Sequence, residues 1–308
     1  MTGARVLTLV VTAEMAGRTV GSLLVRELGL AGGLVRSLKW RGVDGERRQG
    51  IARNGVRART VDRVAAGDVI TVDVGDPTGR GGAFVPAADL PLRILYEDDD
   101  LLVVDKPAGL AMHDRRAGDA PTLGAAVIHH MDDGAVFHPV SRLDRGTSGV
   151  VCVARSGHVH ELLRRRLHTG DYQREYLAVV VGEPSPPAGT VMLPIGPAAD
   201  ARPDGPRREV RADGRSARTD YETVASRDGL SLLRVTLGTG RTHQIRVHLA
   251  AIGCPLLGDA RYGVPDARIG RPALHAAVLR LTHPITGVAL VISAPLPADL
   301  ARVVERLG

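Results

Sequence analysis

One acidic residue, Asp144, stands among glycines and small hydroxyl residues in the segment 138–149, with Arg142 and Arg145 on either side of it. A cation within a few ångströms favours the ionised form of a carboxylate. A carboxylate that is ionised and partly stripped of water is a usable nucleophile. The alternative is a solvated turn with an incidental salt bridge, so the rest of the sequence must decide between the two.

The chain has 308 residues, 40 Lys plus Arg, 34 Asp plus Glu and a formal net charge of +6. Residues 1–75 hold 12 basic and 7 acidic side chains, which makes this segment the better candidate for contact with phosphate. Neither a bilayer-spanning apolar run nor a signal-peptide pattern is present, so we expect a soluble, cytoplasmic protein with no membrane partner. Cys152 and Cys254 are far apart in apolar surroundings and are expected to be packed thiols.

The first quarter of the chain is predicted to be a small, basic α/β domain. Helical patterns cover residues 20–28 and 34–40, Asn54-Gly55 is a strong hairpin signal, and residues 69–74 alternate as a strand. Residues 76–90 are rich in Gly, Pro and Ala without a helical or strand period. We therefore predict a domain over residues 1–75, a linker over residues 76–90 and a larger domain over residues 91–308.

The larger domain is predicted to be α+β, with a large sheet and a few helices. Strands over residues 101–105 and 150–154 would leave the Asp144 motif on a loop at a strand end, where catalytic groups tend to lie. Residues 172–181 alternate as a strand that turns Tyr176 away from the more apolar face. Residues 183–218 have little apolar content and are expected to be long loops.

A helix is predicted over residues 243–252, directly after the turn formed by residues 238–242. Backbone N–H groups and Arg241 would gather at the positive end of this helix, where a phosphate could bind. A second helix is expected after Ser156, a residue type that caps helix N-termini.

Several motifs together make the chain resemble the RluA/RluD-type pseudouridine synthases over nearly all of residues 91–300. They occur in the order found in that family: Tyr96-Glu97-Asp98-Asp99; Lys106-Pro107-Ala108-Gly109 and His113; Arg142-Leu143-Asp144-Arg145-Gly146-Thr147-Ser148-Gly149; Arg174-Glu175-Tyr176-Leu177-Ala178; Gly240-Arg241-Thr242-His243-Gln244-Ile245-Arg246-Val247-His248; Gly258-Asp259 with Tyr262-Gly263; Leu274-His275-Ala276; and His283-Pro284-Ile285-Thr286-Gly287.

The resemblance implies the pseudouridine synthase fold, a catalytic domain with a large mixed, mostly antiparallel β-sheet. It also implies the activity: the glycosidic bond of a uridine in RNA breaks, the uracil turns, and its carbon five rejoins the ribose. The segment 1–75 is similar to the alpha-L RNA-binding domain that precedes many of these catalytic domains. Two positions depart from the usual motif, since Ser141 replaces a common histidine and Gly146 a common acidic residue.

The resemblance also implies roles for individual residues. Asp144 is the essential carboxylate, and whether it attacks the sugar or acts after a glycal forms stays open. Tyr176 is expected to stack on the target base, with a part in proton transfer as a second role, and Arg246 to pair with Asp144. Arg142 is expected to help turn the nucleotide out of the helix, which the chemistry needs because a stacked nucleotide is out of reach. The expected RNA-binding residues are Arg142, Arg145, Arg241, His243 and Gln244.

Three other functions compete with this one. The first is a glycosidase or phosphoesterase with an aspartate nucleophile. A glycosidase would need a second carboxylate near Asp144, whereas Asp98, Asp99 and Asp100 look like a solvated acidic turn. The second is a metal enzyme. His243 and His248 would diverge on a helix, as would His158 and His160, so their spacing is poor for a shared metal. No metal and no cofactor are expected. A non-catalytic RNA-binding protein is the third rival, and the intact Asp144 and Tyr176 argue against it. We expect a structured RNA as partner, preferably large-subunit ribosomal RNA with transfer RNA as the alternative, and no obligate protein partner.

Overall fold

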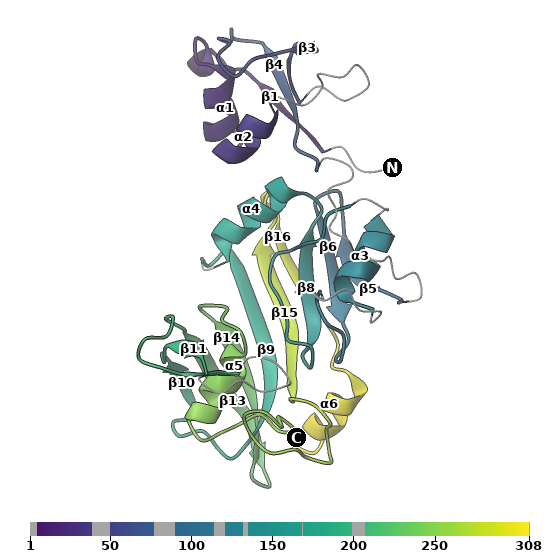
Figure 1. Ribbon diagram of the computed structural model, residues 1–308, viewed down its shortest axis with the longest axis vertical. Helices are drawn as coiled ribbons and strands as arrows, with labels where there is room; N and C mark the ends of the chain where they lie inside the picture. Colours follow the sequence, from purple (N-terminus) through teal and green to yellow (C-terminus); the bar gives the residue numbers. More distant parts are fainter. Residues whose placement is uncertain are drawn as a thin grey trace.

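The computed structural model describes residues 5–38, 50–76, 90–113, 121–131, 135–167, 169–198 and 207–307 of the chain (Figure 1). Residues 77–89 of the predicted linker 76–90 lie outside the described residues. So do residues 39–40, at the end of the second predicted helix. Two bodies are visible in the ribbon, a small one formed by residues 5–76 and a larger one formed by the rest.

The small body is a four-stranded antiparallel sheet with two short helices on one side. Strands β1 (Val6–Val10), β4 (Val69–Asp73), β2 (Ile51–Arg53) and β3 (Val56–Arg57) lie in that order. A 3-10 turn, η1 (Ala13–Met15), precedes helices α1 (Val20–Arg26) and α2 (Gly32–Leu38). The hydrophobic cluster of this body draws only on residues of this segment, among them Leu23, Leu24 and Ile70.

The hairpin predicted at Asn54-Gly55 is present between β2 and β3. Both residues have positive φ, 53° and 78°, as a two-residue turn of this hand requires. The side chain of Asn54 also accepts a hydrogen bond from the backbone N–H of Val69 at 2.8 Å, which ties the turn to β4.

The larger body is built on a ten-stranded sheet, which confirms the predicted fold class. Eight strands follow the order β10-β13-β14-β9-β15-β8-β6-β5, with β16 beside β15 and β7 beside β8. Every pairing is antiparallel except that of β15 with β8. The bounds are β5 Arg93–Glu97, β6 Leu101–Lys106, β7 His138–Pro139, β8 Ser148–Ala154, β9 Tyr172–Val181, β10 Ala188–Val191, β13 Thr219–Arg227, β14 Leu230–Leu237, β15 Leu274–Thr282 and β16 Ala289–Ser293.

Four helices cover the two faces of this sheet. Side chains of α3 (Leu123–Met131) and α5 (Gln244–Ala251) join the largest hydrophobic cluster on one face. On the other face, α4 (Gly157–Arg166) and α6 (Ala298–Val304) pack into two smaller clusters. Ser156 caps α4 as predicted, because its Oγ accepts the backbone N–H of Val159 at 3.3 Å.

Two expectations about the sheet were wrong. The segment 183–218 is not all loop: it contains β10 and a small two-stranded sheet of β11 (Ile195–Pro197) and β12 (Arg208–Val210). Tyr176 does not turn away from the more apolar face either, since it belongs to the largest hydrophobic cluster, whereas Val179 belongs to a smaller one. Helix α5, distant in sequence, supplies apolar cover on the side of Tyr176.

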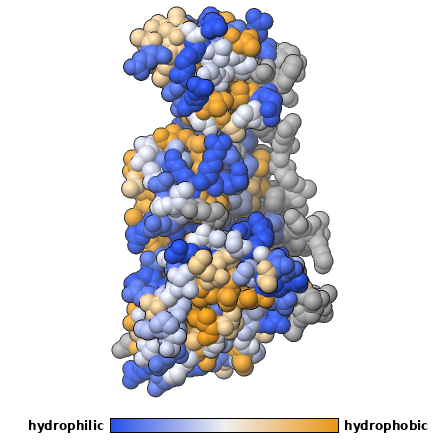
Figure 2. All heavy atoms as spheres, turned by 90° about the vertical axis from the view of Figure 1, so that its left-hand side faces the viewer, coloured by the Kyte–Doolittle hydropathy of each residue, from blue (hydrophilic) through white to orange (hydrophobic). Residues whose placement is uncertain are grey.

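Side-chain contacts join the two bodies near the start of the larger one. Arg5 donates from Nη2 to Asp100 Oδ2 at 2.8 Å, and Asp76 Oδ2 lies 2.7 Å from His138 Nε2. Asp76 also accepts the backbone N–H of Gly157 at 3.2 Å. Asp100 is 3% exposed, so the expectation of a solvated acidic turn was wrong for this residue. A narrowing between the bodies is visible in Figure 2, where hydrophilic and hydrophobic patches alternate over the surface.

Gly149 stands where β8 meets β15, five residues after Asp144. Its φ is +112°, and a Cβ built on it would lie 2.1 Å from the carbonyl oxygen of Ala276. A side chain therefore fits neither the backbone conformation nor the space. Only glycine allows this parallel pairing to form directly beyond the Asp144 loop.

We predict that Gly149→Ala lowers the free energy of unfolding by about 3 kcal/mol or more, since the close backbone contact must open. The matched control is Gly229→Ala, because Gly229 also has positive φ, +72°, but a Cβ added there would meet no atom within 4 Å. Gly229→Ala is expected to lower the free energy of unfolding by about 1 kcal/mol. Urea unfolding measures both values, and equal losses would show that strain of φ, not the close approach, makes glycine necessary.

Candidate active site

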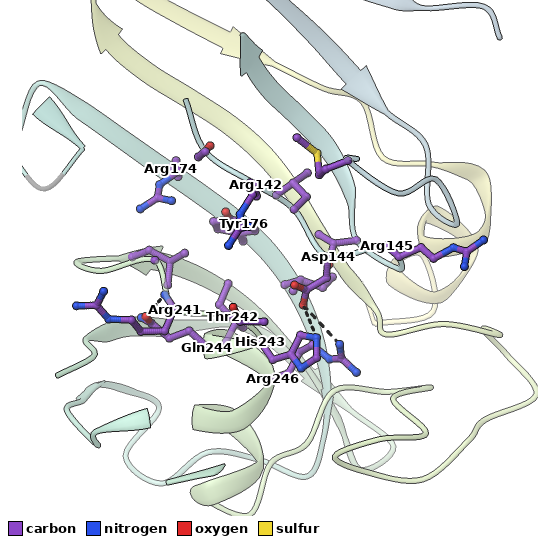
Figure 3. Close-up of a pocket in the computed structure, with 18 of the residues that line it drawn as sticks. Arg142, Asp144, Arg145, Arg174, Tyr176, Arg241, Thr242, His243, Gln244 and Arg246 are labelled. Carbon is purple, nitrogen blue, oxygen red and sulfur yellow. Dashed lines mark hydrogen bonds and ion pairs between the residues drawn. The ribbon is translucent and has the colours of Figure 1, made fainter. Parts of the chain in front are cut away.

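A pocket of about 720 Å³ opens on the α5 side of the sheet (Figure 3). Its walls are the loop that carries Asp144, the strand β9 with Tyr176, and the turn that leads into α5. Of the residues expected to act, Asp144, Tyr176, Arg246, Arg142, Arg145, Arg241, His243 and Gln244 all line it. The fold thus brings together residues that are about a hundred positions apart in the sequence.

The Asp144 loop is anchored on both sides of the carboxylate. Leu143 is 8% exposed and packs into the largest hydrophobic cluster, and the backbone N–H of Thr147 donates to the Asp144 carbonyl at 3.0 Å. The Asp144 side chain is 24% exposed, so it faces the pocket without being fully solvated.

Lys106 also anchors the Asp144 loop, a role that the sequence patterns did not predict. The side chain is fully buried, and Nζ donates to the carbonyls of Pro107 and Leu110, each at 2.9 Å, and of Arg145 at 3.3 Å. Burial lowers the pKa of Lys106 to about 8. Since one ammonium satisfies three carbonyls, it ties the turn after β6 to the residue that follows Asp144.

Arg246 is the cation that faces Asp144. Its Nη1 lies 3.5 Å from Asp144 Oδ2, while Nε and Nη2 each donate to Asp259 at 2.8 Å. Asp259 has a side chain only 1% exposed. Burial alone would raise the pKa of Asp259, but the hydrogen bonds and charge of Arg246 outweigh it and lower that pKa. One guanidinium therefore holds two carboxylates, one buried and one at the pocket.

Neither arginine beside Asp144 in the sequence pairs with it, which corrects the first interpretation of the motif. Arg145 donates from Nε to the carbonyl of Gly109 at 2.8 Å and points away from Asp144 in Figure 3. Arg142 is exposed and has no ion pair with Asp144 in the structure. Successive side chains in this turn point in different directions, so sequence neighbours do not become electrostatic partners.

Tyr176 lies in the wall of the pocket with 4% of its surface exposed. Burial raises the pKa of its hydroxyl, so the side chain stays protonated near neutral pH. Arg174, two residues earlier on β9, also lines the pocket, and its Nε and Nη2 are buried without a hydrogen-bond partner among the described residues. In the sequence, Arg174 stood out only as part of a motif.

Gln244 and Arg241, both expected to contact RNA, also make hydrogen bonds within the protein. The Gln244 side chain is 2% exposed; its Oε1 accepts Thr239 Oγ1 at 2.7 Å and the backbone N–H of Arg241 at 3.0 Å. Its amide also donates to the carbonyl of Arg218 at 2.8 Å, so it braces the turn before α5. Arg241 donates from Nε to the Ser216 carbonyl at 3.0 Å and stays partly exposed at the pocket.

His243 precedes α5 in a left-handed conformation, with φ of 57°. Its Nε2 lies 3.9 Å from Asp144 Oδ2, and its Nδ1 lies 2.8 Å from the hydroxyl of Tyr262. Burial lowers the pKa of His243. The imidazole is therefore neutral near pH 7 and stands beside the carboxylate.

One cluster among the described residues has the spacing of a metal site: the ligand atoms of Asp98, Asp100 and His283 lie within 4.8 Å of one another. His283 Nδ1, however, accepts the backbone N–H groups of Ile285 and Thr286 at 3.2 and 3.0 Å. If the ring is neutral, its proton then lies on Nε2, which is 3.1 Å from Asp98 Oδ2 but has no hydrogen-bond partner among the described residues. A ring in this state offers no lone pair to a metal ion, so the arrangement does not favour a metal site.

Comparison with known proteins agrees with this geometry. Residues 100–251 match the family model described as RNA pseudouridylate synthase. The ribosomal large subunit pseudouridine synthase D of Xanthomonas campestris is 38% identical over 273 residues, covering 82% of this chain and 80% of that protein. The chain belongs to the RluA/RluD family of RNA pseudouridine synthases.

Other members of this pseudouridine synthase family match nearly the whole chain. An uncharacterised RNA pseudouridine synthase of Mycobacterium bovis is 35% identical over 309 residues, covering 95% of each chain. The solved structure of human RNA pseudouridylate synthase domain containing 4 has a TM-score of 0.56 and 27% identity, covering 70% of this chain and 92% of that one. The synthase is accordingly an isomerase. None of its described helices has both the length and the apolarity needed to cross a membrane.

We predict that Asp259→Asn lowers the single-turnover rate of pseudouridine formation by about 100-fold or more, because Arg246 loses the partner that aims it at Asp144. The affinity for RNA should change little. The matched control is Asp299→Asn, since Asp299 holds Arg271 through the same two guanidinium donors, at 2.7 and 3.0 Å, outside the pocket.

Both substitutions remove a carboxylate that neutralises an arginine and should reduce stability, by about 3 kcal/mol for the fully buried Asp259 and by less for Asp299. Only Asp259→Asn should slow the reaction. A rate for Asp259→Asn equal to that of the Asp299→Asn control would mean that the Arg246–Asp259 pair is purely structural.

Proposed function

We propose that the chain modifies specific uridines of large-subunit ribosomal RNA, with Asp144 as the essential carboxylate. The observation that carries the role of Asp144 is the ion pair with Arg246 at the wall of the pocket. Arg246 keeps a fixed cation beside the carboxylate because Asp259 holds the other edge of its guanidinium. The ribosomal target is supported by relatives of 38% and 39% identity whose names give the large ribosomal subunit. A ribosomal substrate agrees with the cytoplasmic location expected from the sequence.

In this proposal Tyr176 closes one side of the space in front of Asp144. Its ring excludes water from the carboxylate and offers an aromatic surface to the uracil. Its hydroxyl stays protonated, because burial raises its pKa, so it can donate a hydrogen bond but cannot act as a base in the resting enzyme.

Binding of RNA is assigned to cations that remain open to solvent. Arg142 is exposed at the pocket and free to enter a helix in place of the target nucleotide. Arg145 is exposed and Arg241 partly exposed at the pocket, and both are proposed to contact phosphate. Residues 1–75 are proposed to be an RNA-binding domain similar to the alpha-L domain, followed by the linker 76–90 and the catalytic domain 91–308.

We predict that a strain of the source organism lacking this gene loses pseudouridine at one or a few positions of large-subunit ribosomal RNA. The wild-type gene should restore them and Asp144→Asn should not, because the amide keeps the shape of the carboxylate without its charge. Chemical mapping of pseudouridine in ribosomal and transfer RNA makes the measurement. Loss confined to transfer RNA would replace the ribosomal target by the alternative one, and restoration by Asp144→Asn would contradict the essential role of Asp144.

We predict that the double variant Arg26→Gln/Arg36→Gln reduces the dependence of RNA affinity on salt. Both arginines are exposed in the last turns of α1 and α2. Each lost phosphate contact lowers the slope of log affinity against log salt by about 0.9 for a duplex.

The control variant Arg227→Gln/Arg302→Gln removes the same charge from exposed positions in β13 and α6. It should leave the slope of wild type. Equal slopes for the two double variants would mean that this surface of the small body does not bind RNA.

A further inference from the structure

One hydrogen-bond donor beside Asp144 has no partner among the described residues. His243 Nε2 lies 3.9 Å from Asp144 Oδ2, which is beyond hydrogen-bond distance. The imidazole lines the pocket and its side chain is 14% exposed. Nε2 is therefore open to a molecule that binds against Asp144.

Tyr262 decides which nitrogen of His243 carries the proton. The Tyr262 hydroxyl accepts the backbone N–H of Arg208 at 2.9 Å and lies 2.8 Å from His243 Nδ1. Among the described residues these are its two hydrogen-bond partners, and a hydroxyl has one proton to give. The hydroxyl could instead accept a second hydrogen bond from Nδ1–H, but its own proton would then have no acceptor among the described residues. The arrangement that pairs every group gives that proton to His243 Nδ1. The neutral imidazole then carries its own proton on Nε2, toward Asp144.

The buried carboxylate that holds Arg246 also holds Tyr262. Asp259 Oδ1 accepts the backbone N–H of Arg261 at 3.0 Å and of Tyr262 at 3.3 Å. The Tyr262 ring lies 4.9 Å from the guanidinium carbon of Arg246 and meets the His243 ring edge-on at 5.6 Å. His243, Arg246 and Asp144 are thus positioned by one connected set of contacts.

We propose that His243 is a further catalytic residue and that Tyr262 is its positioning residue. The inference rests on the role proposed above for Asp144. When the glycosidic bond breaks, its electron pair passes to the uracil ring, and negative charge develops on the carbonyl oxygen next to the glycosidic nitrogen. The Nε2–H of His243 donates a hydrogen bond to that oxygen without giving up the proton. A fixed donor of this kind stabilises charge that exists only as the bond breaks, so it acts on the rate.

The test compares two substitutions of His243 in single-turnover rate and in affinity for one substrate RNA. His243→Asn tolerates the left-handed backbone, but its amide ends near the place of Nδ1 and so removes the donor. The rate should fall about 100-fold while the dissociation constant of the RNA stays within about twofold. His243→Gln carries an amide N–H near the place of Nε2 and should be about tenfold faster than His243→Asn.

A double-substitution cycle tests the part played by Tyr262. Tyr262→Phe keeps the ring under Arg246 but loses the hydroxyl, and should lower the rate about tenfold in the wild-type background. In the His243→Asn background the same change should have less than about a twofold effect. Tyr262→Phe also removes the acceptor of the Arg208 backbone N–H, but it does so in both backgrounds, so this effect cancels in the comparison. Tyr221→Phe is the control, since the Tyr221 hydroxyl donates to the Pro186 carbonyl at 3.2 Å outside the pocket.

Additive effects of the two substitutions would overturn the assignment of Tyr262. A His243→Asn variant with weaker RNA binding and an unchanged rate would overturn the assignment of His243 and leave it as an RNA contact. Asp144→Asn is measured in the same assay. If Asp144→Asn stays active, the role of Asp144 is wrong, while the coupling between His243 and Tyr262 is still read from the cycle.

Discussion

The active site depends on the balance of charge around one buried guanidinium. Arg246 is 8% exposed, and a cation in such surroundings needs a counter-charge. Asp259 supplies it through two hydrogen bonds of 2.8 Å, which use one edge of the guanidinium completely. The remaining nitrogen, Nη1, can reach only toward the pocket, where Asp144 lies. The orientation of the cation is thus decided by Asp259, a buried residue that does not line the pocket.

The sequence predicted a large sheet, several of its strands and helices, and the loop position of Asp144, because these follow from local patterns of apolar and turn residues. It did not predict the partners of Asp144 from the residues themselves. Arg142 and Arg145 are adjacent in sequence and unpaired with it in space, whereas Arg246 is 102 positions away and was found only through the family resemblance. Asp259 belonged to a motif of the family resemblance but was assigned no role. Its bidentate pair with Arg246 joins a helix to a loop, and such a pair leaves no local pattern in the sequence.

The rarity of lysine in the sequence is a signal that could have pointed to the structural role of Lys106. Lysine occurs only at positions 39 and 106 in a chain that otherwise uses arginine, so each lysine calls for a reason. At position 106 the reason is geometric: three carbonyl oxygens surround one nitrogen, and an ammonium can donate three hydrogen bonds in a tetrahedral arrangement. A planar guanidinium is too large and has the wrong shape for this place. Gln244 is a comparable case, since it was expected to contact RNA but its buried side chain makes hydrogen bonds within the protein.

The single parallel pairing in the sheet affects how the protein is made. It joins Ser148 to His275 and Gly149 to Ala276, and Ser148 Oγ and His275 Nδ1 lie 2.9 Å apart. The two residues are 127 positions apart, so bringing them together carries a large entropic cost of loop closure. Pairings between such distant segments form slowly. The Asp144 loop enters β8 through this pairing and acquires its final support only after β15 has been synthesised. During translation, a nascent chain long enough to contain every residue up to Asp259 still lacks that support, so the catalytic pocket matures near the end of synthesis.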